Sequence, residues 1–345
     1  MTDADSRAQR IVGPDRKPAV LRVEGLYVEF PSDVGTVKAA TNVSFDVEAG
    51  KTLGILGESG CGKSVTLRAL CGLVPHPGRV LRGTVELDGE RYETPQELAV
   101  RRGEKLSMIF QDPASSLNPV KTVGAQVSEV LRVKLGQTRA AARSETIELL
   151  GHVGIPEPAR RVNSYPHELS GGMRQRVMIA MAIACKPQVL LADEPTTALD
   201  VTTQEQILRL LLRLQDEFGM AMILVTHDIG VIEEVCDDAV VMYAGYVVER
   251  RPVASLSAAR HPYTRGLIAA MPKIDSRSLP DVIHGQPPDL ATLEPGCPFV
   301  PRCPHVQPEC SLVDMQATTL TDCACPFAAC EGAAPEDSAY AQADA

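Results

Sequence analysis

The chain has 345 residues, of which 44% are hydrophobic, 23% charged and 4% aromatic, and its formal net charge is -10. This length allows one large domain or two modest ones with a buried core, and the composition is that of an ordinary globular protein. The acidic balance argues against a nucleic-acid partner, because a broad nucleic-acid surface needs clustered Lys and Arg to neutralise phosphates.

No segment is expected to cross a membrane. The longest uninterrupted apolar run, Val177–Cys185, has nine residues, whereas a spanning helix needs roughly 18 or more. Residues 1–18 are polar and read as a flexible tail without the apolar core of a signal peptide. The sequence therefore predicts a cytoplasmic protein whose membrane role, if it has one, comes through a partner.

The first part of the chain predicts strands followed by a glycine-rich turn. Leu21–Phe30 alternates and is rich in β-formers, and Thr41–Val47 follows as a second strand. Thr52–Leu56 is short and almost wholly apolar, which indicates a buried strand. A helix is expected over Ser64–Gly72, directly after the glycines.

The middle of the chain adds a hairpin and a helical block. Thr84–Leu87 with the turn Asp88-Gly89 predicts one side of a hairpin. Lys105–Phe110 is another expected strand. From Thr122 to about Val162 the apolar spacing becomes helical. Because this block interrupts the strand-rich part, we expect a helical subdomain.

The pattern then becomes that of an α/β protein. Gly171–Cys185 predicts a helix whose second half is apolar all round and hence buried. Val189–Ala192 and Met222–Thr226 are short apolar strands of the parallel-sheet kind. Thr203–Glu217 is the helix expected between them.

Beyond Arg251 the composition shifts, and we expect a domain boundary there. Prolines recur, and six of the ten cysteines lie between residues 297 and 330. In a cytosolic protein such crowding favours metal binding over disulfides. The last stretch, Glu331–Ala345, is small and acidic, which predicts disorder.

The segment Gly57-Glu-Ser-Gly-Cys-Gly-Lys63-Ser64 fits the phosphate-loop pattern G-x-x-x-x-G-K-[ST] and lies between an apolar strand and a helix. Glycines let the backbone wrap around phosphates, and the helix N-terminus adds positive charge. Lys63 is expected to reach the β- and γ-phosphates, and the Ser64 hydroxyl to ligate Mg²⁺. The alternative is a glycine-rich turn that binds no ligand. The strand before the motif and the helix after it favour the phosphate loop over this alternative. The expected nucleotide contacts here are Gly57, Ser59, Gly60, Cys61, Gly62, Lys63, Ser64 and Val65.

Two carboxylates, Asp193 and Glu194, end the apolar strand Val189–Ala192. At the carboxyl end of a parallel strand, side chains face the ligand crevice. Asp193 is expected to hold Mg²⁺ through its water shell, and Glu194 to polarise the attacking water as general base. A turn with two solvated acids is the alternative, and the phosphate loop makes it less favoured.

The segment Leu169-Ser-Gly-Gly-Met-Arg-Gln-Arg176 resembles the ABC signature motif. Ser170 is well placed as an N-cap, and the glycines allow close backbone approach. In the ABC family this surface serves the nucleotide held by the opposite subunit. The resemblance thus assigns signature and dimer-interface roles to Ser170, Gly171, Gly172, Gln175 and Asp200, the last being the D-loop residue.

Other motifs of the ABC family follow in order. Gln111 resembles the Q-loop glutamine, which implies contact with Mg²⁺ and with a membrane subunit. His227, after an apolar strand, resembles the switch histidine that contacts the γ-phosphate. The family also stacks an aromatic residue on the adenine; Phe30 is the candidate, and Tyr27 the alternative.

Within ABC proteins, the chain resembles the ATP-binding subunits of oligopeptide/dipeptide importers, a group that includes nickel importers. Three segments carry this resemblance: Gln111–Pro119, His261–Gly266 and Gly296–His305. In some relatives such C-terminal cysteines hold a [4Fe-4S] cluster, and the matching positions are Cys297, Cys303, Cys310 and Cys325. Zinc or no metal are the alternatives, because the spacing is not that of ferredoxins and extra thiols at Cys323 and Cys330 compete as fourth ligand.

The resemblance implies a P-loop NTPase fold of the α/β class. It has a RecA-like core, an antiparallel β subdomain, and a helical subdomain over about residues 114–175. The ATPase domain is expected over 19–255 and a Cys/Pro-rich C-terminal region over 256–330.

The implied cofactors are ATP and Mg²⁺. The implied partners are two transmembrane permeases, a second and paralogous ATPase subunit and, indirectly, a solute-binding protein, with this chain on the cytoplasmic face of the cell membrane. The cargo stays open between peptides, nickel chelates and other small solutes. Alternatives of other classes are an ABC ATPase acting on ribosomes or DNA and a redox-sensing Fe–S protein.

Overall fold

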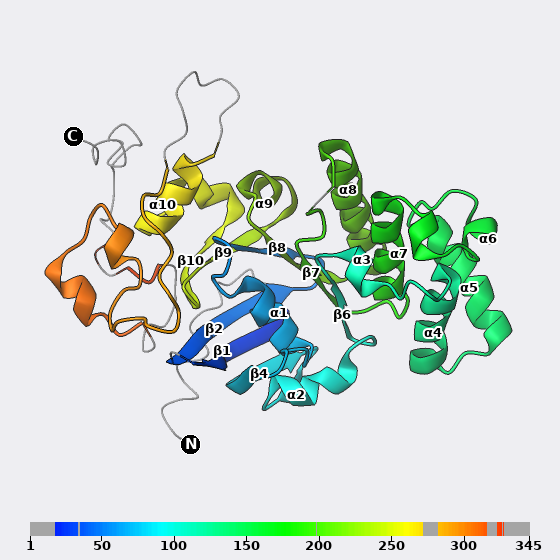
Figure 1. Ribbon diagram of the computed structural model, residues 1–345, viewed down its shortest axis with the longest axis horizontal. Helices are drawn as coiled ribbons and strands as arrows, with labels where there is room; N and C mark the ends of the chain where they lie inside the picture. The colour runs from blue at the N-terminus through cyan, green and yellow to red at the C-terminus, as the bar shows by residue number, and fades with distance from the viewer. Residues whose placement is uncertain are drawn as a thin grey trace.

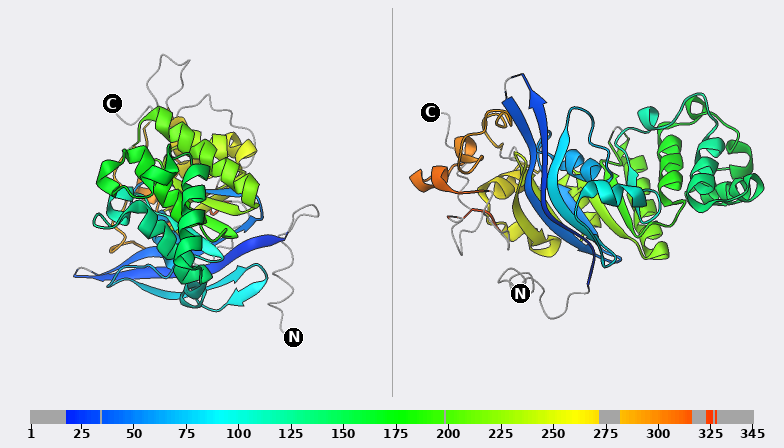
Figure 2. Two further views of the ribbon diagram at one scale, coloured as in Figure 1. Left: turned by 90° about the vertical axis from the view of Figure 1, so that its right-hand side faces the viewer. Right: turned by 90° about the horizontal axis from the view of Figure 1, so that it is seen from below.

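The computed structural model of the chain describes residues 18–33, 35–197, 199–271, 282–315, 323–325 and 327. Almost all of the expected N-terminal tail (1–18) lies outside these residues, as do the expected C-terminal tail (331–345) and Cys330. Two sheets occupy the middle of the molecule, with a block of helices at one end and the C-terminal region at the other (Figures 1 and 2).

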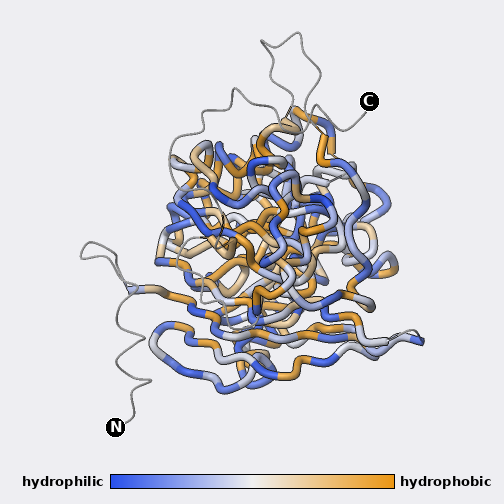
Figure 3. The backbone as a smooth tube through the Cα atoms, turned by 90° about the vertical axis from the view of Figure 1, so that its left-hand side faces the viewer, coloured by the Kyte–Doolittle hydropathy of each residue, from blue (hydrophilic) through white to orange (hydrophobic). Residues whose placement is uncertain are grey.

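The smaller sheet is antiparallel, with four strands in the order β2-β1-β4-β5. Along β2, Val43, Phe45 and Val47 are buried while the residues between them are half-buried, and Figure 3 shows this alternation of apolar and polar residues along the strands. The expected second strand is longer than predicted, because pairing continues to the Ser32–Gly35 turn. The expected hairpin is confirmed as β4–β5. The strands are β1 (Ala19–Ser32), β2 (Gly35–Glu48), β4 (Arg79–Leu87) and β5 (Glu90–Tyr92).

The larger sheet has six strands in the order β10-β9-β3-β8-β7-β6. All its pairs are parallel except β9–β10. Every residue of β3, β6, β7 and β8 is buried, which explains their continuous apolar runs. The strands are β3 (Thr52–Leu56), β6 (Leu106–Ile109), β7 (Val189–Asp193), β8 (Ala221–Thr226), β9 (Asp238–Tyr243) and β10 (Tyr246–Pro252).

Helices cover both faces of the parallel sheet. One hydrophobic core lies between the antiparallel sheet, α1 and the parallel sheet, and a second joins the parallel sheet to α7, α8 and the helical block. The expected helix at Ser64 begins one residue earlier, and the expected buried helix ends at Ile183. The main helices are α1 (Lys63–Leu70), α7 (Gly171–Ile183), α8 (Val201–Phe218) and α9 (Ile229–Val235).

The helical block expected after Thr122 consists of α4, α5 and α6. The hydroxyls of Thr122 and Thr138 cap α4 and α5 by accepting backbone N–H groups, and Gly136 ends α4 in the left-handed conformation. The block shares its core with α7 and α8, so α7 connects it to the parallel sheet. The helices are α4 (Val123–Leu135), α5 (Arg139–His152) and α6 (Pro158–Arg161).

Several short helices lie in the connections. The short α-helices are α2 (Pro95–Leu98), α3 (Pro113–Ser116) and α10 (Pro262–Ala269); the 3-10 helices are η2 (Ala99–Arg101), η3 (Pro166–Glu168), η4 (Val253–Ala258), η5 (Val300–Arg302) and η6 (Pro308–Leu312). Within the described part of the chain, every helix falls short of the length and apolarity that crossing a bilayer requires.

The C-terminal region packs directly on β9 and β10. Its residues Tyr263 and Phe299 share one hydrophobic core with Tyr243 of β9. The Ala324 N–H donates to the Val248 carbonyl at 2.8 Å. The fully buried Glu249 carboxylate accepts the backbone N–H groups of residues 260 and 261 at 2.7 and 3.0 Å. The composition shift near Arg251 thus falls at the end of β10. The region beyond it packs against β9 and β10 and is hydrogen-bonded to β10.

Candidate nucleotide site

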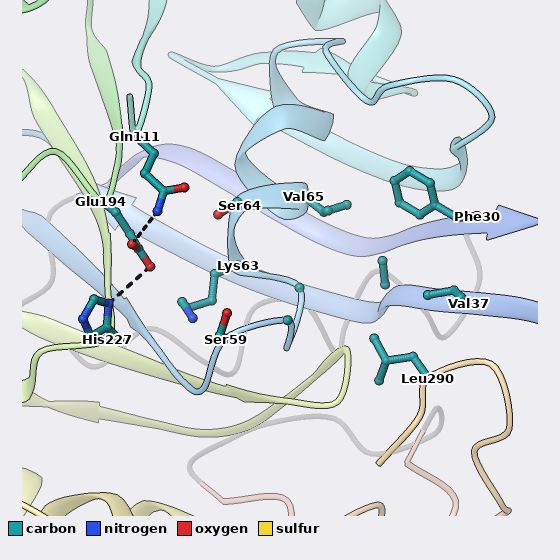
Figure 4. A pocket seen from close by; sticks show the side chains of 13 residues that line it. Phe30, Val37, Ser59, Lys63, Ser64, Val65, Gln111, Glu194, His227 and Leu290 are labelled. Carbon is teal, nitrogen blue, oxygen red and sulfur yellow. Dashed lines mark hydrogen bonds and ion pairs between the residues drawn. The ribbon is translucent and has the colours of Figure 1, made fainter. Parts of the chain in front are cut away.

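Four loops meet at the carboxyl edge of the parallel sheet. The phosphate loop follows β3, and the loops carrying His227, Glu194 and Gln111 follow β8, β7 and β6, which are successive neighbours in the sheet. Together they border a cavity of about 610 Å³ (Figure 4). Its lining consists of Phe30, Val37, Ala39, Ser59, Gly60, Gly62, Lys63, Ser64, Val65, Gln111, Glu194, His227 and Leu290.

Two glycines of the phosphate loop lie against neighbouring backbone. At Gly57, where φ is +154°, an added Cβ would lie 2.2 Å from the Met242 carbonyl oxygen. At Gly62, where φ is +106°, it would lie 2.1 Å from that of Ala39. Larger residues would therefore displace the loop. Gly57 and the buried Cys61, both expected to contact nucleotide, lie outside the cavity lining, while the other expected loop residues are part of it.

Lys63 and Ser64 begin α1 and line the cavity. The Lys63 ammonium donates to the carbonyl oxygens of Gly57 and Glu58 at 2.7 and 2.9 Å. The Ser64 hydroxyl donates to Asp193 Oδ1 at 2.7 Å. The helix N-terminus beside them adds partial positive charge, so the loop is suited to phosphate oxygens.

Asp193 meets the requirements for a magnesium ligand. It is fully buried, and its Oδ2 has no hydrogen-bond partner among the described residues. Burial raises the pKa of this carboxyl group, which a bound cation would oppose. Hard oxygen donors from Ser64 and Asp193 therefore fit Mg²⁺. Gln111, the third expected contact, donates a hydrogen bond to Glu194 Oε2 at 2.9 Å.

Glu194 is held by three side chains at the cavity edge. Its Oε2 accepts from the Thr197 hydroxyl at 2.9 Å. The same oxygen accepts from Gln111 Nε2 at 2.9 Å, and Oε1 lies 3.4 Å from His227 Nδ1; these two contacts are drawn in Figure 4. Its backbone has φ of +45°, and its N–H donates to the Val225 carbonyl at 3.0 Å. This strained backbone directs the carboxylate to the cavity. Sequence reasoning missed Thr197, for which no motif gave a signal.

The far end of the cavity is apolar. Phe30, Val37, Val65 and Leu290 line it (Figure 4). Phe30, the candidate for stacking on adenine, therefore lies where an apolar ring would fit. The alternative, Tyr27, lies outside the lining, under the Arg82 guanidinium at 3.9 Å from its ring centroid. Leu290 belongs to the C-terminal region, and nothing in the sequence pointed to it.

The signature residues form a separate group outside this cavity. The Ser170 hydroxyl caps α7 by accepting the Met173 N–H at 3.3 Å. The Asp200 carboxylate caps α8 by accepting the Thr203 N–H at 2.9 Å. A Cβ added to Gly172 of α7 would lie 2.9 Å from the methyl group of the same Thr203. The start of α7, which is Gly171, is thus adjacent to the start of α8. Gln175 is buried behind them, and Ala198 of the expected D-loop lies outside the described residues.

The four cysteines expected to bind a cluster line one cavity of about 20 Å³, enough for about one water molecule. They are Cys297, Cys303, Cys310 and Cys325. Burial raises the pKa of Cys297 to about 11 and that of Cys323 to about 12. Among the described residues, no group of three or more His, Cys, Asp or Glu side chains is arranged to hold a metal ion. The expected cluster therefore has no support in this part of the structure.

Comparison with known proteins identifies the family. Residues 40–197 match the family described as ABC transporter, and residues 248–310 match the oligopeptide/dipeptide transporter, C-terminal region. The oligopeptide transport ATP-binding protein OppD of Salmonella typhimurium is 47% identical over 86% of this chain and 90% of its own length. The dipeptide transport ATP-binding protein DppD of Escherichia coli is 45% identical over 88% and 94%.

Solved structures agree with this result. The ATP-binding cassette MJ0796, in a dimeric post-hydrolysis state bound to ADP and Pi, superposes with a TM-score of 0.60 at 30% identity, covering 68% of this chain and 98% of that one. The expected P-loop α/β cassette is thereby confirmed. The chain belongs to the ABC transporter family, in the group that carries the oligopeptide/dipeptide transporter C-terminal region.

Proposed function

We propose that this chain is the ATP-hydrolysing subunit of an ABC importer for oligopeptides or dipeptides. The observation that carries the proposal is the meeting of Gln111, Glu194 and His227 at the cavity that holds the phosphate loop. The similarity to OppD and DppD supports peptides as cargo, and nickel or another small solute is the alternative. The test is phosphate release from Mg-ATP by the chain purified with its partner ATPase subunit, followed by peptide uptake when the two are combined with their permeases and solute-binding protein.

The residues divide the reaction among them. Lys63 and the loop N–H groups bind the phosphates, and Ser64 with Asp193 would hold Mg²⁺, which supplies charge neutralisation. Glu194 orients a water molecule and accepts its proton as that water attacks the γ-phosphorus. Gln111 and Thr197 keep the carboxylate in place through their hydrogen bonds. His227, 3.4 Å from the same carboxylate, is placed to contact the γ-phosphate.

The proposal includes a second ATPase subunit, a paralogue of this chain. Ser170, Gly171 and Asp200 form a surface outside this chain's own cavity, as expected if they contact nucleotide held by the other subunit. The dimeric state of the similar cassette MJ0796 supports such pairing. We also propose two permease partners, an indirect solute-binding protein, and a place on the cytoplasmic face of the membrane.

Leu290 provides a test of where the adenine ring of ATP lies. Replacing Leu290 with Ser is expected to weaken ATP binding about two- to fivefold, because a half-buried Leu contributes part of the burial free energy of a full side chain. Titration with a fluorescent ATP analogue measures the dissociation constant. Leu312→Ser, at a residue 82% exposed in the same region, is the matched control. Equal affinity for the Leu290 variant and the control would exclude this contact.

A [4Fe-4S] cluster at the cysteines is a further proposal, drawn from the family resemblance. The four thiols line one cavity, but that cavity is too small for a cluster and would have to open. Protein purified anaerobically from iron-replete cells is then expected to contain about four iron atoms per chain and to be brown. Cys297→Ser should lower the iron content more than Cys323→Ser, whose side chain lies outside the cavity lining. A colourless, iron-free wild-type preparation would remove the proposal.

A further inference from the structure

Glu58, the second residue of the phosphate loop, forms an ion pair with a residue of the C-terminal region. Arg302 Nη1 lies 2.6 Å from Glu58 Oε2, and Nη2 lies 2.9 Å from Oε1. The Arg302 side chain is 3% exposed and that of Glu58 24%. This is a bidentate and largely desolvated pair, the geometry in which a guanidinium holds a carboxylate most firmly.

Arg302 is itself fixed from several sides. Its Nε donates to the His284 carbonyl at 3.0 Å, and Nη2 also donates to that of Ile283 at 3.3 Å. Its Nη1 also donates to the Tyr243 hydroxyl at 3.3 Å. Every guanidinium nitrogen therefore has a partner, so the arginine can position Glu58 and is not a freely moving surface charge.

A second residue of the same region holds the Glu58 backbone. The Tyr263 hydroxyl accepts the Glu58 N–H at 2.8 Å. Tyr263 is fully buried, with ring centroids 4.5 Å from Tyr243 and 5.4 Å from Phe299. Its own N–H donates to His261 Nδ1 at 3.1 Å, at the start of α10. Burial lowers the pKa of His261 to about 4, so the ring is neutral near neutral pH and its Nδ1 can accept this hydrogen bond.

Glu58 in turn touches the residue that binds phosphate, because its carbonyl oxygen accepts from Lys63 Nζ at 2.9 Å. Its carboxylate, N–H and carbonyl are thus all engaged, two of them by the C-terminal region. We propose that Arg302 and Tyr263 are positioning residues for ATP binding, which hold the phosphate loop through Glu58. The inference rests on the proposed ATP hydrolysis and adds the C-terminal region to the nucleotide site.

The expected consequence concerns binding more than chemistry. A loop already held in its binding conformation loses less conformational freedom when the phosphates arrive. Without Arg302, nucleotide binding must also order the loop, whereas Glu194 and its partners on β6, β7 and β8 are unaffected. The KM for ATP should therefore rise while kcat stays close to its wild-type value.

The experiment measures KM, kcat, nucleotide affinity and thermal stability for Arg302→Gln, Glu58→Gln and the double variant. Arg302→Gln is expected to raise KM about tenfold, within the range that coupled neighbouring residues show, with kcat changed less than about twofold. The double variant should be no worse than the more affected single variant. Tyr263→Phe keeps the ring packing and should raise KM by a smaller factor. Arg160→Gln, which breaks the exposed pair with Glu157, is the control.

Two outcomes would overturn the proposal. One is a wild-type KM in both Arg302→Gln and Tyr263→Phe. The other is a double variant whose loss equals the product of the single losses, since the two residues would then act independently. If Arg302→Gln fails to fold, Glu58→Gln and Tyr263→Phe decide by the same criteria. Absence of hydrolysis by the wild-type chain in the presence of its partner ATPase subunit would instead contradict the proposed function, while the affinity measurements would still test Arg302.

Discussion

Replacing Glu194 with Gln is expected to stop ATP turnover while leaving nucleotide binding in place. The amide oxygen of Gln can still accept a hydrogen bond from Gln111 or Thr197, so the local geometry is largely kept. The amide cannot take a proton from water, and loss of a general base lowers rates by about 10² to 10⁴. Steady-state phosphate release and titration with a fluorescent ATP analogue measure the two effects separately.

The control for Glu194 is a glutamate with no part in the site. Glu205 on α8 pairs with Arg209 at the surface, so Glu205→Gln should hydrolyse ATP at the wild-type rate. Turnover by the Glu194 variant within about tenfold of wild type would remove this residue from the role of general base. Loss of binding together with turnover would assign it a structural role instead.

Replacing Lys63 with Ala is expected to weaken nucleotide binding and abolish hydrolysis. Lys63 is buried and lines the cavity, and it is the cation that begins α1 beside the phosphate loop. Charge-assisted hydrogen bonds to phosphate oxygens are among the stronger polar contacts, so affinity should fall roughly 10- to 100-fold. Binding of ATP measured by calorimetry gives the change in dissociation constant.

Lys121, which pairs with Glu129 at the surface of the helical block, is the matched control for Lys63. Lys121→Ala should bind ATP as the wild type does. An unchanged dissociation constant in Lys63→Ala would contradict the assignment of the phosphate loop. A parallel thermal unfolding measurement separates loss of binding from loss of fold, because the lysine also donates to two carbonyl groups of its own loop.

The sequence predicted most local elements of the site because the signals for them are local. The apolar run of β3, the glycines after it and the start of α1 are contiguous, so strand, loop and helix could be recognised together. The same holds for β7 with Asp193 and Glu194. Boundaries that depend on distant pairing were less accurate, and β2 is longer than predicted because it pairs with β1 up to the turn.

The cysteine cluster shows where resemblance extends beyond what the residues support. Spacing alone left iron, zinc and free thiols open, and the four thiols do line a single cavity. That cavity has room for about one water molecule, and the buried thiol of Cys297 has a pKa raised to about 11. A thiol must lose its proton to bind metal, so the raised pKa opposes metal binding. Measured iron content, and not the motif, decides whether a cluster is present.

The sequence by itself determined which residues are the candidates for the chemistry: Lys63 and Ser64 in the loop, Glu194 after a buried strand, and the ordered motifs of the family. Only the tertiary structure decided which of them meet. The strand order β3-β8-β7-β6 brings Gln111, Glu194 and His227 to one edge of the sheet. The order of parallel strands depends on how they pack in the folded protein, so no single strand's sequence predicts it. The contact between Glu58 and Arg302 spans 244 residues, and no local pattern marks either end of such a contact.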